Sequence, residues 1–320
     1  MGIKRIYHVG VNCADMRRST RFYSGLLGMH ATPVTIPEHL REKWDVAAKK
    51  ILGLEVDGRI NAEPYLLAGS ESAEATYIDL IEWRSPRTFG RPYETMTNIG
   101  IARVALFVDD VDATYERLVS NGIKCLSEPR TLVVDSGAEF RCVAFRDPDG
   151  TVMECIQTRF PTPADATPEV RRLFHINVNC TDLNRSLEFY GDTLGLDIVL
   201  RAAWCESQEL GDILGLGERA SADVCLLATE QGTEGTCVDL VEWKKPRFTG
   251  KPYERMNHLG IPRMAFLVDS VDGMYEKVLR KGVKFVSDPV TIQFDPPLGK
   301  MRAVCFYDPD GTVLECLELS

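Results

Sequence analysis

Four polar side chains recur in the same order in both halves of this sequence, and each is of a type that can do chemistry. Histidine and carboxylates transfer protons or bind metal ions, and arginine stabilises an oxyanion. The first set is His8, Asp79, Arg103 and Glu154, and the second is His175, Asp239, Arg263 and Glu315. The sequence therefore presents one potential reaction centre twice.

The recurrence belongs to an internal duplication. The stretch DPDGTVME at 147–154 returns as DPDGTVLE at 308–315, and residues 79–103 align with 239–263 without a gap. A repeat at a long, fixed spacing indicates duplicated structural units, so a residue found in both copies can be interpreted twice.

The carboxylates lie in unfavourable places for a charge. Glu154 and Glu315 each stand inside an apolar strand-like stretch, and Asp79 and Asp239 do the same. A buried carboxylate is costly unless it is paired or bound to a metal. We therefore expect these four side chains, with His8 and His175, to line a site rather than to fill an ordinary core. Glu82 and Glu242 alternate to the other strand face and are expected at the rim or surface.

Arg103 and Arg263 have two interpretations that the sequence leaves open. One is a clamp for a substrate oxyanion, and the other is a buried ion pair with the nearby carboxylates. A guanidinium cannot be a metal ligand. About 4 Å from a dication, at an effective dielectric of ~20, it would be repelled by roughly 8 kcal/mol.

Composition limits the class of protein. The 320 residues suit two domains, and the net charge of −10 argues against nucleic acid as a partner. No run is long and apolar enough to span a membrane, and the N-terminal segment has no signal-peptide pattern. Ten cysteines without a CxxC pair indicate free thiols. We expect a cytoplasmic protein that acts on small molecules as a monomer or homodimer.

Hydrophobic periodicity predicts the order strand, helix and three strands, four times over. The Pro-rich segment 161–169 is the predicted linker. It separates a first domain at 1–160 from a second at 170–320, each holding two such modules.

A strand–helix–three-strand module that begins with His and ends on D-P-D-G-x-x-x-E resembles the vicinal oxygen chelate superfamily, which includes glyoxalase I, bleomycin-resistance proteins and extradiol dioxygenases. The resemblance covers nearly the whole chain, and further carriers are the Phe22-Tyr23 and Phe189-Tyr190 pairs with Leu27-Gly28 and Leu194-Gly195. It implies an α+β fold of four βαβββ modules arranged as two paired-module, cup-shaped domains. Modules could pair within each half or across the halves.

The resemblance also implies roles. The superfamily usually places His, Glu or Gln, His and Glu around one divalent cation. Here Asp replaces the second group and Arg the third. The implied metal ligands are His8, Glu154, His175 and Glu315, and the implied catalytic residues are Arg103, Arg263, Asp79 and Asp239. The cofactor would be a divalent metal ion (Zn, Mn, Fe or Ni), and the Arg substitution leaves open a cup without one.

The expected activity is therefore that of a vicinal-oxygen-chelate-type enzyme on a small oxygenated metabolite. Isomerase, lyase or epimerase chemistry needs only a base and a cation that stabilises an enediolate. One alternative is extradiol ring cleavage, which needs two His and a carboxylate. His258 could act there only as an acid. The other alternative is a non-catalytic protein that sequesters a drug or another small molecule, with Trp44, Trp83, Trp204 and Trp243 lining its cup.

Overall fold

The computed structural model describes residues 2–69, 74–134, 137–294 and 299–320, which form four modules of the expected order. Module 1 contains β1 (Ile3–Cys13), α1 (Met16–Thr20) continued by the π-helix η1 (Arg21–Leu26), β2 (His30–Pro33), β3 (Asn61–Ala68) and β4 (Tyr77–Ser85). Its insertion between β2 and β3 folds as η2 (Glu38–Leu40) and α2 (Arg41–Leu52). Module 2 contains β5 (Gly100–Val108), α3 (Val111–Ser120), β6 (Arg130–Val133), β7 (Glu139–Arg146) and β8 (Val152–Gln157).

The second half repeats this order. Module 3 contains β9 (Val170–Asn179), α4 (Leu183–Leu187) with η3 (Glu188–Leu194), β10 (Asp197–Ser207), α5 (Gln208–Ile213), β11 (Ala220–Ala228), η4 (Gly232–Glu234) and β12 (Cys237–Lys245). Module 4 contains β13 (Gly260–Val268), α6 (Val271–Leu279), β14 (Val290–Gln293), β15 (Lys300–Tyr307) and β16 (Val313–Leu319). The first helix of each module begins after an Asp or Ser whose side chain accepts a backbone N–H of the first turn. These caps are Asp15, Asp110, Asp182 and Ser270.

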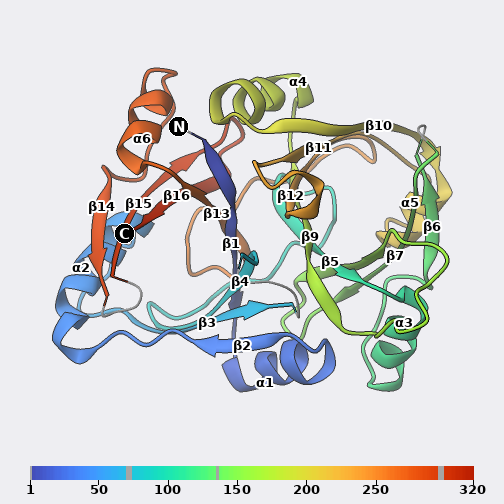
Figure 1. The fold of residues 1–320 in the computed structure, drawn as a ribbon, viewed down its shortest axis with the longest axis horizontal. Helices are drawn as coiled ribbons and strands as arrows, with labels where there is room; N and C mark the ends of the chain where they lie inside the picture. The colour runs from blue at the N-terminus through green and yellow to red at the C-terminus, as the bar shows by residue number, and fades with distance from the viewer. Residues whose placement is uncertain (1, 70–73, 135–136, 295–298) are drawn as a thin grey trace.

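The strands form two curled eight-stranded sheets, and each sheet joins modules from different halves. The orders are β14-β15-β16-β13-β1-β4-β3-β2 and β10-β11-β12-β9-β5-β8-β7-β6. At the centre β1 runs antiparallel to β13, and β5 runs antiparallel to β9. Figure 1 shows blue and red strands together in one sheet, and green and yellow strands together in the other. The fold is thus the expected α+β arrangement of paired modules, but residues 1–160 and 170–320 are not self-contained cups. Module 1 pairs with module 4, and module 2 with module 3.

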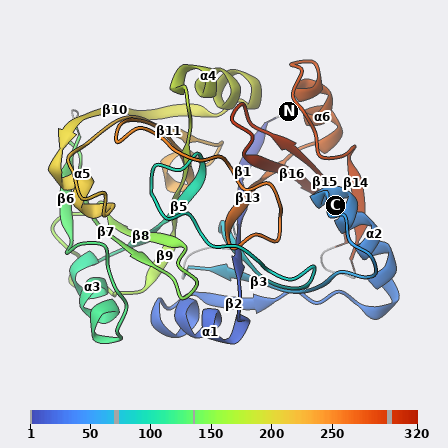
Figure 2. The same cartoon turned by 180° about the vertical axis from the view of Figure 1, so that it is seen from behind.

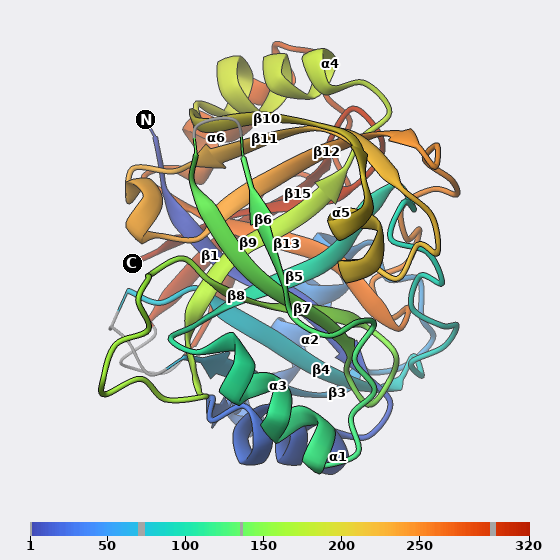
Figure 3. The ribbon, with the colours of Figure 1, turned by 90° about the vertical axis from the view of Figure 1, so that its right-hand side faces the viewer.

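The main hydrophobic core contains side chains from all four modules. Alternation along the four central strands places one face of each sheet against this core. Val9, Val104, Ile176 and Met264 are all fully buried there. The opposite, concave face of each sheet is left for a site, and α2 and α5 lie at opposite ends of the molecule beside these faces (Figures 1 and 2). Figure 3 looks onto the sheet of modules 2 and 3.

The D-P-D-G turns hold the two modules of each half together. Tyr23 of module 1 donates its hydroxyl to Asp147 of module 2 at 2.8 Å, and Tyr190 donates to Asp308 at 3.0 Å. Burial raises the pKa of both aspartates to about 6, although the tyrosine hydroxyls and nearby backbone N–H groups act in the opposite direction. The motif therefore links the two modules within each half, whereas each eight-stranded sheet is formed by modules from both halves.

Two further features have structural roles. Glu82 and Glu242 accept hydrogen bonds from the backbone N–H groups of Met16 (2.7 Å) and Leu183 (3.0 Å), and so provide acceptors for the first turns of α1 and α4.

All ten cysteines are free, and eight are buried. Among the described residues, no helix is long and apolar enough to cross a membrane.

Candidate active sites

The structure brings all eight predicted side chains together, in two sets of four drawn from different halves. Cup A, in the sheet of modules 1 and 4, holds His8, Asp79, Arg263 and Glu315. Cup B, in the sheet of modules 2 and 3, holds His175, Asp239, Arg103 and Glu154. No member is more than 7% exposed.

Strand register explains why the four side chains of a cup meet. In cup A, His8 and Glu315 both lie opposite Ala265, and Arg263 and Asp79 both lie opposite Gly10. Ala265 on β13 and Gly10 on β1, each the small residue on the middle one of three strands, leave room for the longer side chains on the strands to either side. In cup B, Ala105 lies between His175 and Glu154 in the same way.

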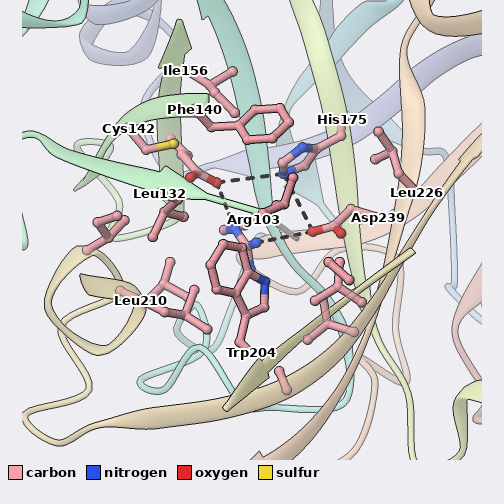
Figure 4. A pocket seen from close by; sticks show the side chains of 18 of the residues that line it. Arg103, Leu132, Phe140, Cys142, Ile156, His175, Trp204, Leu210, Leu226 and Asp239 are labelled. Carbon is pink, nitrogen blue, oxygen red and sulfur yellow. Dashed lines mark hydrogen bonds and ion pairs between the residues drawn. The ribbon is translucent and has the colours of Figure 1, made fainter. Parts of the chain in front are cut away.

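One guanidinium joins the two carboxylates of each cup. In cup A the Nε of Arg263 donates to Glu315 Oε2 at 3.1 Å, and its Nη2 donates to Asp79 Oδ2 at 2.6 Å. In cup B the corresponding bonds of Arg103 to Glu154 and Asp239 measure 2.9 and 3.1 Å. Figure 4 shows this cup B cluster, with Arg103 and His175 both directed toward Asp239. The buried ion-pair interpretation of both arginines therefore describes the geometry.

The histidines lie close to the same oxygens. His8 Nε2 is 3.4 Å from Glu315 Oε2 and 3.9 Å from Asp79 Oδ2. In cup B, His175 Nε2 is 3.6 Å from each carboxylate. Each imidazole therefore faces two carboxylates, and its Nε2 is too far from at least one of them for a hydrogen bond.

Electrostatics keep the glutamates ionised. Burial alone would raise the pKa of Glu154, but Arg103 and His175 outweigh it and bring that pKa down to about 2. The pKa of Glu315 falls to about 2 in the same way, through His8 and Arg263. Burial lowers the pKa of each arginine, and the two carboxylates more than reverse this. Each cup therefore holds one fixed cation and at least one fixed anion.

Two buried polar atoms lack a hydrogen-bond partner among the described residues in both cups, the Nε2 of the histidine and the Nη1 of the arginine. Cup B has a third, the Oδ1 of Asn177. A buried polar atom without a partner costs about 1–3 kcal/mol and is rare in native proteins. The same two atoms are without a partner in both cups, so each cup offers two polar atoms to a ligand or to water.

A divalent metal does not fit the cups as they are arranged. The carboxylate oxygens that would bind the ion already accept hydrogen bonds from Nε and Nη2 of the arginine. A guanidinium at that position would also repel the ion. Within the described ranges, no group of three or more His, Cys, Asp and Glu side chains is arranged to hold a metal. As they are arranged here, the histidines and glutamates therefore do not form the metal site that the resemblance implied.

The cluster of each cup borders a cavity with apolar walls. The cavity of cup A measures about 170 Å³, and that of cup B about 90 Å³. All four tryptophans line them, Trp44 and Trp83 in cup A and Trp204 and Trp243 in cup B. The insertion helices close one side, since α2 lies against β14 and α5 against β6. His258 lines neither cavity and instead stacks on Tyr253 at 4.4 Å.

Asn177 contributes to cup B and was not identified from the sequence. Its Nδ2 is 3.3 Å from Asp239 Oδ2, so this carboxylate has a second donor. The corresponding residue of cup A is Gly10, where a Cβ would lie 2.8 Å from Arg263 Nη1. The available signal was the second residue after the site histidine, which differs between the repeats.

The comparisons with known proteins agree with this architecture. The sequence model of the Glyoxalase/Bleomycin resistance protein/Dioxygenase superfamily matches residues 5–155 and 172–316. Uncharacterized protein YaeR of Escherichia coli is 27% identical over 154 residues, which cover 48% of this chain and 96% of YaeR. Uncharacterized protein YraH of Bacillus subtilis is 27% identical over 148 residues, 46% of this chain and 98% of YraH.

Two solved structures share the fold across almost the whole chain. Glyoxalase I from Zea mays superposes with a TM-score of 0.67 at 18% identity, covering 98% of this chain and 92% of that one. A putative dioxygenase from Bacillus subtilis gives a TM-score of 0.62 at 13% identity, covering 99% and 86%. With both repeats matched by one family model, the chain belongs to the glyoxalase/bleomycin resistance/dioxygenase superfamily.

Proposed function

We propose that each cup catalyses proton transfer at the carbon next to the carbonyl group of a small, uncharged ketone or aldehyde with an apolar body. The observation that carries this proposal is the pair of unpartnered atoms, histidine Nε2 and arginine Nη1, beside an apolar cavity. A base and an oxyanion donor in one site are what enolisation requires.

The charge of the cluster favours an uncharged substrate. Arginine, aspartate and glutamate sum to one net negative charge in each cup. A carboxylate ligand about 4 Å from that net charge would be repelled by roughly 4 kcal/mol at an effective dielectric of ~20, about a thousand-fold in affinity. A carbonyl oxygen carries no such penalty and can accept a hydrogen bond from Nη1.

The charges also match the proposed step. The histidine takes the proton from carbon, so an imidazolium and an enolate form together and the total charge of the cup is unchanged. In cup A the carboxylates of Glu315 and Asp79, 3.4 and 3.9 Å from His8 Nε2, stabilise the imidazolium. Arg263 Nη1 stabilises the enolate oxygen, and return of a proton to the opposite face of the same carbon gives an epimer. If that carbon carries a hydroxyl group, protonation of the former carbonyl carbon, with transfer of the hydroxyl proton to the enolate oxygen, gives an isomer. Asp79, Asp239 and the glutamates thus act by holding the arginine and the charged histidine.

Deuterium exchange tests the proposal without knowledge of the natural substrate. The protein is incubated in D2O with hydroxyacetone or 2-hydroxyacetophenone, and exchange of the hydrogens next to the carbonyl is followed by NMR. We expect exchange above the buffer rate, reduced at least 100-fold when both His8→Gln and His175→Gln are introduced. His30→Gln, at an exposed histidine of β2, is the matched control.

Binding without exchange would overturn the enzymatic proposal. It would favour the sequestering protein instead, which the apolar walls and four tryptophans would suit. Phenylglyoxylate, a carboxylate of similar size, is the charge control and should bind about a thousand-fold more weakly.

The setting of the protein is proposed on two further observations. Ten unbridged cysteines suit a reducing compartment such as the cytoplasm. Each cup is complete within one chain, so a monomer has all the groups that the proposed step needs.

A further inference from the structure

The two cups differ at a residue that a β-bulge turns into the cavity. In the pairing of β1 with β13, Ile6 lies opposite Phe266 and His8 opposite Ala265, which leaves Tyr7 as the extra residue. In the pairing of β9 with β5, Leu173 lies opposite Leu106 and His175 opposite Ala105. The extra residue there is Phe174.

A bulge breaks the strict alternation of side chains and can re-aim one of them toward a site. Tyr7 and Phe174 accordingly line the cavities of cup A and cup B, although each is adjacent in sequence to a histidine that faces the same cavity. The ring centroids of Tyr7 and His8 are 5.7 Å apart, and those of Phe174 and His175 are 5.5 Å apart. The only chemical difference at this shared position is a phenolic hydroxyl.

That hydroxyl is held in its protonated, hydrogen-bond-donating form. Burial raises the pKa of Tyr7, and neighbouring Tyr77 and Asp79 act in the same direction, while Arg5 opposes them. The guanidinium carbon of Arg5 lies 5.0 Å from the centre of the Tyr7 ring and fixes its outer side. Tyr7 therefore adds a side chain with a hydroxyl group to the lining of cup A, in addition to the cluster that it shares with cup B.

The cavities differ in size as well as in chemistry. Cup A, at about 170 Å³, is larger than an engineered 150 Å³ protein cavity that binds benzene. Cup B, at about 90 Å³, is too small for a ring without widening, and Trp204 and Phe140 are among the large side chains that line it. The sequence repeat has thus produced two sites that share the His, Asp, Arg and Glu cluster but differ in the width and polarity of their cavities.

We propose that Tyr7 and Phe174 determine specificity, so that cup A takes carbonyl compounds with a ring that carries a hydrogen-bonding substituent and cup B takes smaller ones without a ring. This rests on the proposed function for the carbonyl head group alone. The shared His, Asp, Arg and Glu recognise the head group, and the bulge residue and the cavity width select the body of the ligand.

The chain offers matched variants that isolate each cup. Ala62 lies opposite Trp83 and lines cup A, and Ala222 lies opposite Trp243 and lines cup B. Ala62→Leu should therefore fill cup A, and Ala222→Leu should fill cup B, without touching either cluster. Calorimetric titration of these two variants then reports the affinity of the remaining cup.

The probes are hydroxyacetone, 2-hydroxyacetophenone and the three derivatives of 2-hydroxyacetophenone that carry one further hydroxyl group on the ring (ortho, meta or para). We expect the aromatic ketones to bind the Ala222→Leu variant, whose cup A is open, at least 10-fold more tightly than the Ala62→Leu variant. At least one ring-hydroxylated isomer should lose about 5- to 10-fold in affinity for cup A on Tyr7→Phe, while the parent ketone and hydroxyacetone change less than 2-fold. Phe174→Tyr, combined with Ala62→Leu, is the reciprocal change and should not weaken cup B for hydroxyacetone by more than 2-fold.

The outcomes separate the two proposals. If the ketones bind but both cups show the same preferences and Tyr7→Phe affects every probe equally, the specificity assignment is wrong and the proposed function stands. If no ketone binds either cup while the folded state is intact by circular dichroism, the carbonyl head group is wrong and both proposals fall.

Discussion

Replacing Arg263 by methionine should damage the protein far more than replacing Glu315 by glutamine, although the two side chains belong to one ion pair. Arg263, Asp79 and Glu315 together carry one net negative charge. Arg263→Met raises this to two, with both carboxylates buried and without their shared donor. Glu315→Gln lowers it to zero and leaves the 2.6 Å bond between Arg263 and Asp79 in place.

The magnitudes follow from general measurements on buried pairs. Removing one partner of a buried ion pair costs about 3–5 kcal/mol, because the other charge stays buried. Arg263→Met strands two such charges, so we expect the upper end of that range, about 5 kcal/mol. Glu315→Gln loses one charge-assisted hydrogen bond, about 1.5–3 kcal/mol, and relieves the net negative charge. We expect a net cost of about 2 kcal/mol or less.

Differential scanning calorimetry at pH 7.5 measures both effects. At roughly 2–4 °C per kcal/mol for domains of this size, Arg263→Met should lower the Tm by about 10 °C or more, and Glu315→Gln by less than about 8 °C. Arg280→Met, at a surface arginine whose side chain is 72% exposed, is the control and should change little. Equal losses for Arg263→Met and Glu315→Gln would refute the argument from net charge.

Four other changes test separate parts of the structure. Asp147→Asn should alter how stability depends on pH. In the folded protein the pKa of Asp147 is about 6, above its ordinary value of about 3.9. The protonated Asp147 therefore stabilises the fold below pH 4, and this stabilisation is lost as the pH rises through 6. The wild type should therefore lose roughly 2 kcal/mol relative to Asp147→Asn between pH 4 and pH 7 in urea unfolding, and parallel curves would contradict the assignment. Arg103→Met should cost about 1 kcal/mol less than Arg263→Met because Asn177 still donates to Asp239, and adding Asn177→Gly should remove that difference. Glu82→Ala and Glu242→Ala should each cost about 1 kcal/mol through loss of a helix N-terminal acceptor, measured by Tm against Glu254→Ala at the exposed surface. His8→Gln and Arg103→Met should be additive in unfolding free energy because they lie in different cups, whereas His8→Gln and Arg263→Met should not be; the opposite pattern would mean that modules pair within each half.

Much of the fold could be predicted from the sequence because the physical signals were local and repeated. Period-two and helical patterns predicted four modules, and carboxylates inside apolar strands indicated four of the eight site positions. The histidines and arginines were predicted from their recurrence in both halves and from the resemblance. The prediction for Glu154 and Glu315 did not depend on which strands pair, because a buried carboxylate needs a partner in either arrangement. The roles of the eight residues stay proposals, since geometry places them together without testing their chemistry.

The pairing of modules could not be predicted because equivalent strands have nearly equivalent sequences. Strand β5 reads GIARVALFV and β13 reads GIPRMAFLV, so β1 has the same hydrophobic complement in either partner. The D-P-D-G contacts to the helix of the preceding module stay within a half and do not decide which sheet a strand joins. Register is set by the whole packed assembly, which local patterns do not report.

The side chains that distinguish the cups were hidden for a different reason. Strict alternation would place Tyr7 and His8 on opposite faces of β1, and only the bulge brings both to cup A. A bulge depends on the partner strand and leaves no mark in the sequence of its own strand. The contrast between Gly10 and Asn177 was visible, but its meaning depended on knowing that Arg263 lies across Gly10.

The exchange of an imidazole for a guanidinium changes what four shared positions can do. A neutral imidazole leaves the carboxylates free to bind a cation that enters with a substrate or cofactor. A guanidinium supplies a permanent cation, occupies one oxygen of each carboxylate, and keeps one donor, Nη1, without a partner. The cup then resembles an oxyanion site more than a metal site, because its positive charge is built in and points at the place where negative charge would develop. The cost of burying that charge is met by Asp79 and Glu315, and the same two acids stand ready to stabilise a protonated His8. One substitution, repeated in both cups, thus couples the stability of the fold to the chemistry that we propose for it.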